Sequence, residues 1–198
     1  MENLKQQFIQ KLLDTGREGM ENVIRHLERL GFFVAPASTK FHLSIKGGLM
    51  QHSWNVCQTA LMLREQMIQM KPELAEKLPL DSVVIAALLH DVCKSNIYKD
   101  TILNRKNEQG IWEKVPGFDV DYSGLPLGHG EKSVIMLLTL GLKLTRDEML
   151  AIRWHMTAWE LAFHSAEQKG NLQKAREIAP LCCIIQAADG LASSLLEE

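Results

Sequence analysis

Apolar residues recur at steps of three and four along most of the chain, which is the period of α-helices that bury one face. The helices that this pattern predicts cover residues 4–13, 20–30, 47–70, 82–94, 130–140, 145–155, 159–168, 172–178 and 180–196. Between the second and the third of them, Pro36 and a run of small and polar residues interrupt the period. The pattern therefore predicts a set of packed helices with one irregular segment at residues 32–46.

Several of these helices carry signals for their ends. Gly31 follows the second helix as a C-terminal glycine, and Asp81 is a suitable N-cap for the helix from residue 82. Thr145 and Glu148 form a capping-box pattern, and Pro180 suits the first turn of the last helix. The signals support the boundaries that the apolar pattern predicts.

Residues 96–127 break the helical pattern. Two short strands are predicted at residues 98–103 and 111–115, and residues 107–110 are a good connection between them. No linker, repeat or low-complexity segment divides the chain. We therefore predict one all-α domain, a helical bundle with a small inserted β-hairpin. Its parts are N-terminal helices and a loop (residues 1–46), a helical core (47–193) and the hairpin insertion (98–115), within a single domain of residues 1–198.

The composition is that of an ordinary globular protein. Hydrophobic residues make up 46% of the 198 residues, charged residues make up 23%, and the formal net charge is -2. This charge argues against tight binding of long nucleic acid. No apolar run reaches the roughly 18 residues of a membrane-spanning helix, so we expect no membrane partner. The four cysteines lack the spacing of a disulfide framework, which favours a cytoplasmic location. The oligomeric state stays open.

Charged residues interrupt faces that should be apolar. Asp91 follows His90 at the end of an apolar run, and an unpaired carboxylate buried there would cost many kcal/mol. Asp189 lies on the edge of the inward stripe of the last helix. Gly190 follows it and costs roughly 1 kcal/mol of helix stability relative to alanine. These positions are typical of a functional site rather than of a core.

Histidines occupy similar places. His52 and His155 lie three or four residues from apolar residues of one helix face, and His129 lies between two glycines where a loop meets a helix. A single histidine in such a place is more often a hydrogen-bonded core residue than a ligand. Together with His90, Asp91 and Asp189 they make six such side chains on five separate segments, which favours a metal centre instead. Imidazoles mixed with carboxylates suit one or two ions of Mn, Fe, Co, Ni or Zn, and Mg stays possible. The three other histidines are His26 and His164, which we interpret as surface residues, and His42, which we leave open.

The order of the six residues resembles that of the HD-domain superfamily, in the branch with two further histidines between the His-Asp pair and the last Asp. The strings that carry the likeness are Gly47-Gly-Leu-Met-Gln-His52, Ala87-Leu-Leu-His-Asp-Val-Cys-Lys94, Leu127-Gly-His-Gly-Glu-Lys-Ser133, Ile152-Arg-Trp-His155 and Ala187-Ala-Asp189. The family usually has glycine where this chain has Cys93, and relatives often have a second histidine where it has Met156. The first two strings are also similar to the HD portion of a bacterial 3′-to-5′ exoribonuclease family.

The resemblance implies a fold, a metal centre and a reaction. The fold would be the HD-domain helical bundle. One divalent ion would be held by His52, His90, Asp91 and Asp189, and a second by His129 and His155, with Asp91 as the bridge. In such a centre, a metal-activated water attacks phosphorus.

Four residues are candidates for binding the phosphate of a substrate. Lys94 would contact it as a point charge and assist catalysis with Asp91, although a solvated lysine at a helix C-terminus has the same pattern. Gly128 and Lys132 lie where a glycine-containing loop opens a helix, which suits an anion or an exposed capping loop. Arg153 faces either the cleft or the surface.

The leading function is metal-dependent hydrolysis of a phosphate ester, with a nucleotide or another small phosphorylated metabolite as the substrate. The alternatives are a 3′-5′ nuclease or phosphodiesterase for short oligonucleotides or cyclic nucleotides, a non-hydrolytic di-iron oxygenase, and a nucleotide- or metal-binding sensor. Basic and aromatic residues of the hairpin suit a phosphate and a base, or an ordinary solvated hairpin. We expect the hairpin to cover the metals as a wall or lid.

Overall fold

The structure is a computed structural model that describes residues 1–157 and 165–197. The elements of these residues are, in chain order, α1 (Glu2–Leu13), α2 (Met20–Leu30), α3 (Gly48–Met70), η1 (Pro72–Leu74), α4 (Leu80–Leu89), η2 (Val92–Lys94), β1 (Tyr98–Lys106), β2 (Trp112–Val120), α5 (His129–Thr139), α6 (Arg146–Arg153), α7 (Ala166–Ile178), α8 (Leu181–Leu191) and the π-helical turn η4 (Ala192–Leu196). The prediction of an all-α fold with a small inserted hairpin is confirmed.

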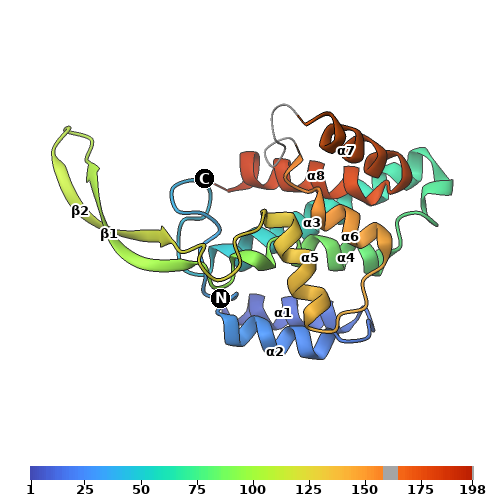
Figure 1. Ribbon diagram of the computed structural model, residues 1–198, viewed down its shortest axis with the longest axis horizontal. Coiled ribbons are helices and arrows are strands. Elements are labelled where there is room, and N and C mark those ends of the chain that lie inside the picture. Colours follow the sequence, from blue (N-terminus) through green and yellow to red (C-terminus); the bar gives the residue numbers. More distant parts are fainter. Residues whose placement is uncertain (158–164, 198) are drawn as a thin grey trace.

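The centre of the bundle is α4, which packs against α3, α6 and α8, while α1 and α2 lie together along one side (Figure 1). Every side chain of α4 from Ser82 to Leu89 is buried. A helix that is apolar on all sides is stable only inside a core, and this one is surrounded by the others. The two residues that follow it, His90 and Asp91, therefore lie in the interior of the molecule.

The helix that we predicted over residues 82–94 ends at Leu89 and is followed by the separate turn η2. The reason is a tertiary contact. The N–H of Cys93 donates its hydrogen bond to Oγ of Ser133, on α5, at 3.3 Å, rather than to a carbonyl of α4. The prediction of Asp81 as the N-cap is also wrong. Asp81 lies inside the first turn of α4, where its carboxylate accepts a hydrogen bond from Arg17 at 2.6 Å.

A buried carboxylate network joins three segments at the other end of α4. The predicted capping box at Thr145 and Glu148 is confirmed. Glu148 is fully buried and also binds both terminal nitrogens of Arg17, at 2.6 and 2.8 Å, and Oγ of Ser82, at 2.7 Å. The loop after α1 and the starts of α4 and α6 are thereby fixed to one another.

Two further helix boundaries differ from the prediction. The helix α6 ends at Arg153, so His155 lies in the turn beyond it rather than on the helix. The break that we predicted between residues 168 and 172 does not exist, because α7 runs without interruption from Ala166, with Ser165 as its N-cap. Most of the helix predicted at residues 159–168, and His164, lie outside the described residues.

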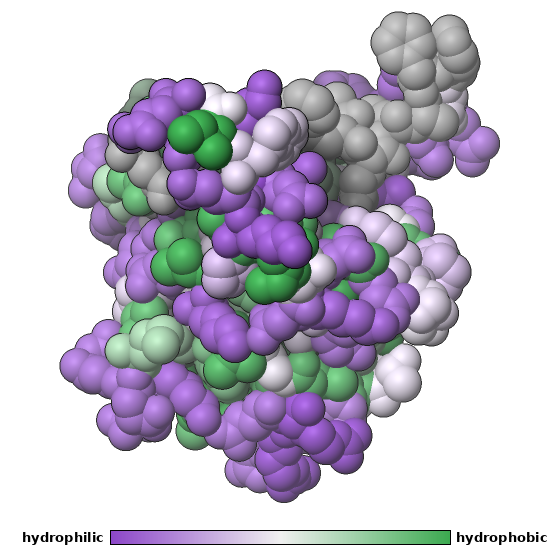
Figure 2. Space-filling model, turned by 90° about the vertical axis from the view of Figure 1, so that its left-hand side faces the viewer, coloured by the Kyte–Doolittle hydropathy of each residue, from purple (hydrophilic) through white to green (hydrophobic). Residues whose placement is uncertain are grey.

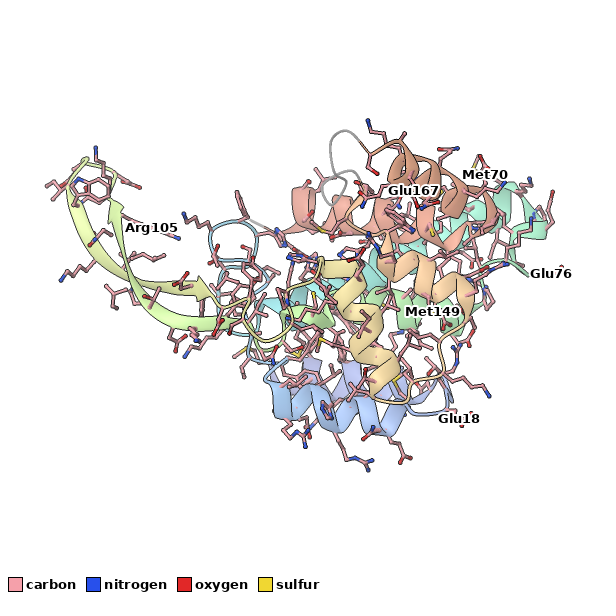
Figure 3. The ribbon with its side chains drawn as sticks, in the orientation of Figure 1. Glu18, Met70, Glu76, Arg105, Met149 and Glu167 are labelled. Carbon is pink, nitrogen blue, oxygen red and sulfur yellow. The ribbon has the colours of Figure 1, made fainter. Side chains whose placement is uncertain are left out.

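The hairpin is longer than predicted. Its strands pair from Tyr98 with Val120 to Lys106 with Trp112, so the insertion ends at residue 120 rather than at 115. The predicted connection is confirmed, since the N–H of Asn107 donates a hydrogen bond to the carbonyl of Ile111. The hairpin projects away from the helices (Figure 1), and Arg105 lies on the part that extends beyond them (Figure 3).

The face of the molecule on the side of the hairpin is largely hydrophilic, with scattered hydrophobic residues (Figure 2). In the described part of the chain, no individual helix has the length and apolar character needed to cross a membrane. The pair formed by α7 and α8 with η4 meets the criterion only as two segments bent by 106°.

Candidate metal centre

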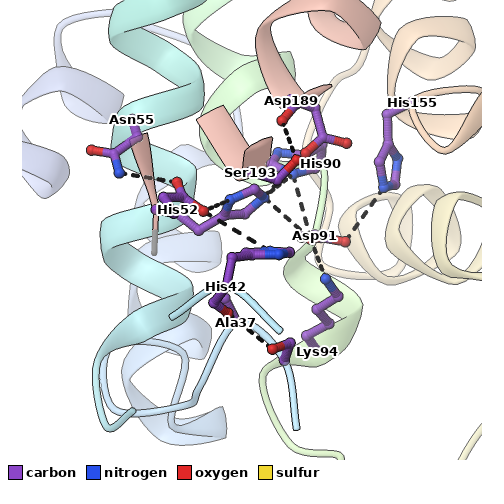
Figure 4. Close-up of polar contacts among 12 residues, drawn as sticks. Ala37, His42, His52, Asn55, His90, Asp91, Lys94, His155, Asp189 and Ser193 are labelled. Carbon is purple, nitrogen blue, oxygen red and sulfur yellow. Dashed lines mark hydrogen bonds and ion pairs between the residues drawn. The ribbon is translucent and has the colours of Figure 1, made fainter. Parts of the chain in front are cut away.

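Imidazole and carboxylate groups from four separate regions meet around Asp91 (Figure 4). His52 comes from α3, and Asp189 comes from α8. His90 and Asp91 come from the junction between α4 and η2, and His155 comes from the turn after α6. The structure thus brings together five of the six residues that the resemblance assigns to metal binding, and the sixth, His129, opens α5 beside them.

The spacing of the donor atoms fits a shared cation. Nε2 of His52 lies 3.2 Å from Nε2 of His90 and 3.3 Å from Oδ1 of Asp189. Nε2 of His90 lies 3.5 Å from Oδ2 of Asp91. Two ligands bound at about 2.1 Å to one ion are roughly 3.0–3.4 Å apart in tetrahedral or octahedral geometry. The donors therefore already stand close to the separations that a metal ion requires.

The imidazole rings are held in the orientation that metal binding needs. Nδ1 of His90 donates a hydrogen bond to the carbonyl of Ala87 at 2.8 Å, and Nδ1 of His155 donates to the carbonyl of Ile152 at 2.7 Å. A carbonyl oxygen only accepts, so each proton is on Nδ1 when the ring is neutral. The lone pair of Nε2 then faces the cluster, as in protein metal sites with a supporting outer hydrogen bond.

Asp91 presents its two carboxylate oxygens to different neighbours. Oδ2 lies 3.7 Å from Nε2 of His52, whereas Oδ1 lies 3.4 Å from Nε2 of His155. Oδ1 of Asp91 and Nε2 of His155 are both buried, and neither has a hydrogen-bond partner among the described residues. Buried polar atoms without partners are rare. A cation held by these residues would satisfy both atoms, and Asp91 would offer one oxygen toward His52 and the other toward His155.

The second group of donors includes a thiol. Donor atoms of Asp91, Cys93 and His129 all lie within 4.8 Å of one another. Burial raises the pKa of the Cys93 thiol to about 12, so it is protonated in the metal-free protein. Cys93 replaces the glycine that the family usually has, and it adds a sulfur atom beside the predicted second ion.

The carboxylates of the cluster stay ionised. Burial alone would raise the pKa of Asp91, but the ammonium group of Lys94 and the ring of His90 outweigh it and hold the pKa well below its usual value. Burial also opposes ionisation of Asp189, but its hydrogen bond with His52 lowers the pKa. The carboxylates of Asp91 and Asp189 therefore give the cluster the negative charge that a cation needs.

Lys94 lies in the same cavity as these donors. Its Nζ is 2.7 Å from Oδ2 of Asp91, and the residue is 8% exposed. The cavity encloses about 270 Å³, and polar residues complete its lining, among them Thr157, Gln186 and Ser193. Gly190 lines it too, and a Cβ at this position would meet no other atom within 4 Å.

The other residues predicted to bind substrate lie elsewhere. Lys132 lines a different cavity, beside α5. The guanidinium of Arg153 lies 4.1 Å from the ring centroid of Trp154 and forms an ion pair with Glu131 at 2.7 Å. Gly128 is the exposed N-cap of α5. The structure therefore gives these three residues no place in the lining of the metal cavity.

The expectation that the hairpin forms a lid is wrong. No residue from 99 to 120 is among the described residues that line the metal cavity, and the strands project away from it (Figure 1). The physical reason is that β1 and β2 pair only with each other and continue outward from their base. Only that base approaches the site, where the hydroxyl of Tyr98 donates a hydrogen bond to the carbonyl of Ala37.

Sequence reasoning missed two residues of the site, Glu197 and Asn55, and left a third, His42, open. Glu197 accepts hydrogen bonds from Nδ1 of His52 at 2.8 Å and from the amide of Asn55 at 3.0 Å. The ring of His42 lies 4.9 Å from that of His52, and His42 lines the cavity. The signal that could have identified Asn55 is its position three residues after His52, on the same face of α3. Nothing in the local sequence distinguishes Glu197.

The donor set suits a divalent metal ion, because imidazoles and carboxylates converge at short separations. Buried donor atoms of Asp91 and His155 also lack a hydrogen-bond partner among the described residues. The HD domain family matches residues 49–194, a range that contains all six predicted ligands. No curated protein and no solved structure shows significant similarity to the chain. On this match over most of its length, and on the histidine and aspartate cluster, the chain belongs to the HD domain family.

Proposed function

We propose that this protein is a metal-dependent phosphohydrolase that cleaves a phosphate ester of a nucleotide or another small phosphorylated metabolite. The observation that carries the proposal is Asp91, a carboxylate buried among the imidazoles of His52, His90 and His155, with the ammonium group of Lys94 beside it. The HD domain family is generally one of metal-dependent hydrolases. Divalent ions supply Lewis-acid chemistry to such reactions by lowering the pKa of water and neutralising charge on phosphoryl oxygens.

The residues of the chain have distinct roles in this proposal. Asp91 would bind metal through both carboxylate oxygens, since they face different imidazoles. Lys94 pairs with Asp91 in the metal-free protein. With a cation at Asp91, its ammonium group is placed to pair with a phosphoryl oxygen in the same cavity. Serine and threonine hydroxyls in the lining are suitable donors to the remaining oxygens.

The size of the cavity supports a small substrate. Its volume of about 270 Å³ lies just below the usual range for small-molecule sites, which begins at about 300 Å³. The formal net charge of -2 gives no general attraction to long nucleic acid. A single phosphate group with a small organic part fits these observations better than a polymer does.

The test is a hydrolysis screen with protein loaded with Mn, Fe, Co, Ni or Mg. The substrates are nucleotides, cyclic nucleotides, sugar phosphates and short RNA, and oxygen consumption is followed for the iron-loaded sample. Asp91→Ala should abolish activity, and Asp119→Ala, which removes an exposed carboxylate on β2, should leave it unchanged. Hydrolysis that persists in Asp91→Ala, or oxygen consumption without hydrolysis, would contradict the proposal.

A further inference from the structure

A second cavity lies beside α5. It encloses about 420 Å³ between one face of α5, the end of α2 and the segments that follow η2 and β2. Its described lining has no residue in common with that of the metal cavity. The volume lies within the usual range for small-molecule sites. The cavity is therefore a separate place for a ligand.

Lys132 gives this cavity its charge. The residue is 7% exposed and lines the cavity. Its ammonium group forms no hydrogen bond and no ion pair with any other residue that the structure describes. Nζ of Lys132 is not among the fully buried side-chain atoms that lack a partner, so the ammonium group keeps accessible surface although most of the residue is buried. This arrangement leaves a position for an anion.

The acidic residue in the described lining does not fill that position. The carboxylate of Asp121 binds Nζ of Lys99 at 2.5 Å and the N–H of Ser123 at 2.9 Å. Its charge is thus compensated by Lys99, outside the cavity lining. The charge of Lys132 remains uncompensated within the cavity.

The rest of the lining favours a ligand with an apolar body. Leu30, Ile97, Ile135 and Met136 contribute aliphatic and thioether surface, while Asn96 and Thr139 contribute polar groups. We propose that this cavity binds a small organic anion, with a phosphate, phosphonate or carboxylate group at Lys132 and an apolar body against α5. The proposal is independent of the metal centre and of the reaction proposed for it.

The test is an NMR titration of the full chain, labelled with ¹⁵N and freed of metal by dialysis against a chelator, with phenylphosphonate as the probe. Saturable amide shifts are expected at the cavity, including Asn96, Lys132 and Thr139. Inorganic phosphate lacks the apolar body and benzyl alcohol lacks the anion, so each should bind about tenfold more weakly or worse. Shifts that centre on His52 and Asp189, or that require added metal, would overturn the proposal.

Matched variants of α5 make the test specific. Ile135 and Leu138 are 44% and 45% exposed on the same helix, but only Ile135 is among the residues that line the cavity. Ile135→Glu should repel the anion and weaken binding about tenfold or more, whereas Leu138→Glu should not change it. Lys132→Met should abolish binding, and if that variant does not fold, the Ile135 and Leu138 pair still decides. Equal binding by the wild type and both glutamate variants, or no binding by the wild type, refutes the proposal.

Discussion

Nδ1 of His52 lies 2.8 Å from Oε2 of Glu197, while Nε2 of the same ring lies 3.3 Å from Oδ1 of Asp189. Glu197 is 6% exposed and follows the π-helical turn η4, which brings its carboxylate behind the ring. A carboxylate in this position fixes the tautomer of a ligating histidine and makes the opposite nitrogen a better donor. Glu197 is therefore a positioning residue for His52.

Replacement of Glu197 should weaken metal binding without removing a ligand. Glu197→Leu is expected to raise the metal dissociation constant by about 10- to 100-fold, because the ring loses its outer hydrogen bond. Glu197→Gln keeps an acceptor and should restore most of the affinity. Competition with a chromogenic chelator measures the constants, and Glu177→Leu on the exposed face of α7 serves as the control. If Glu197→Leu binds as tightly as the control, the positioning role is refuted.

Metal binding should release a proton from His52. Burial alone would lower the pKa of His52, but the hydrogen bonds to Asp189 and Glu197 outweigh it and raise the pKa from 6.5 to about 9. Since the folded value is the higher one, the stability that His52 gives the metal-free protein is present below about pH 6.5 and is lost as the pH rises through about 9.

Ligation requires the neutral ring, so metal binding near pH 7 should release about one proton from His52. The apparent affinity should increase with pH up to about 9. Calorimetric titration in buffers with different ionisation enthalpies counts the released protons. An observed heat that is the same in every buffer would contradict this prediction.

Contact between α5 and α6 should determine how the second donor group is arranged. A Cβ at Gly130 would lie 2.1 Å from the carbonyl oxygen of Arg153, whereas a Cβ at Gly170 would meet nothing within 4 Å. Gly130→Ala should lower the free energy of unfolding by about 1–3 kcal/mol and displace His129 from His155.

Gly170→Ala is the matched control for this variant. It should raise stability by about 0.5–1 kcal/mol, because alanine is the better residue inside a helix such as α7. Urea unfolding measures both changes. If the two variants have the same stability, the contact of Gly130 with Arg153 has no structural importance.

The Glu148 network should stabilise the fold without affecting metal binding. Glu148→Ala leaves the guanidinium of Arg17 without its buried partner, and breaking a buried pair costs about 3–5 kcal/mol. We expect a lower urea midpoint together with an unchanged metal dissociation constant at temperatures where the variant is folded. A folded variant with impaired metal binding would show that the network also shapes the site.

Much of the fold was predictable because apolar periods are local. The long helix was predicted to end near residue 70, and α3 ends at Met70. The end of α4 was not predictable, because it depends on the hydrogen bond from Cys93 to Ser133, 40 residues further along the chain. Within residues 82–94 nothing in the apolar period indicates that contact.

The residues of the site also divide into those that the sequence could predict and those that it could not. His52 and Asp189 were recognisable as polar residues on apolar faces, and the order of the motifs grouped them. Glu197 was not recognisable, because its role depends on a contact with His52, 145 residues away, through a turn that continues no apolar stripe. The substrate role suggested for Arg153 rested on its closeness in sequence to His155, whereas in the structure its guanidinium lies over the ring of Trp154 and forms an ion pair with Glu131.

The metal content of Asp91→Ala tests the central claim most directly. Wild type, Asp91→Ala and Asp119→Ala would be loaded with Mn²⁺, freed of excess ion by gel filtration and measured by inductively coupled plasma mass spectrometry, with circular dichroism as a check of folding. The account predicts one or two ions per chain in the wild type and in Asp119→Ala, and loss of bound metal from folded Asp91→Ala. A wild type without stoichiometric metal, or an Asp91→Ala variant that retains the full amount, would contradict it.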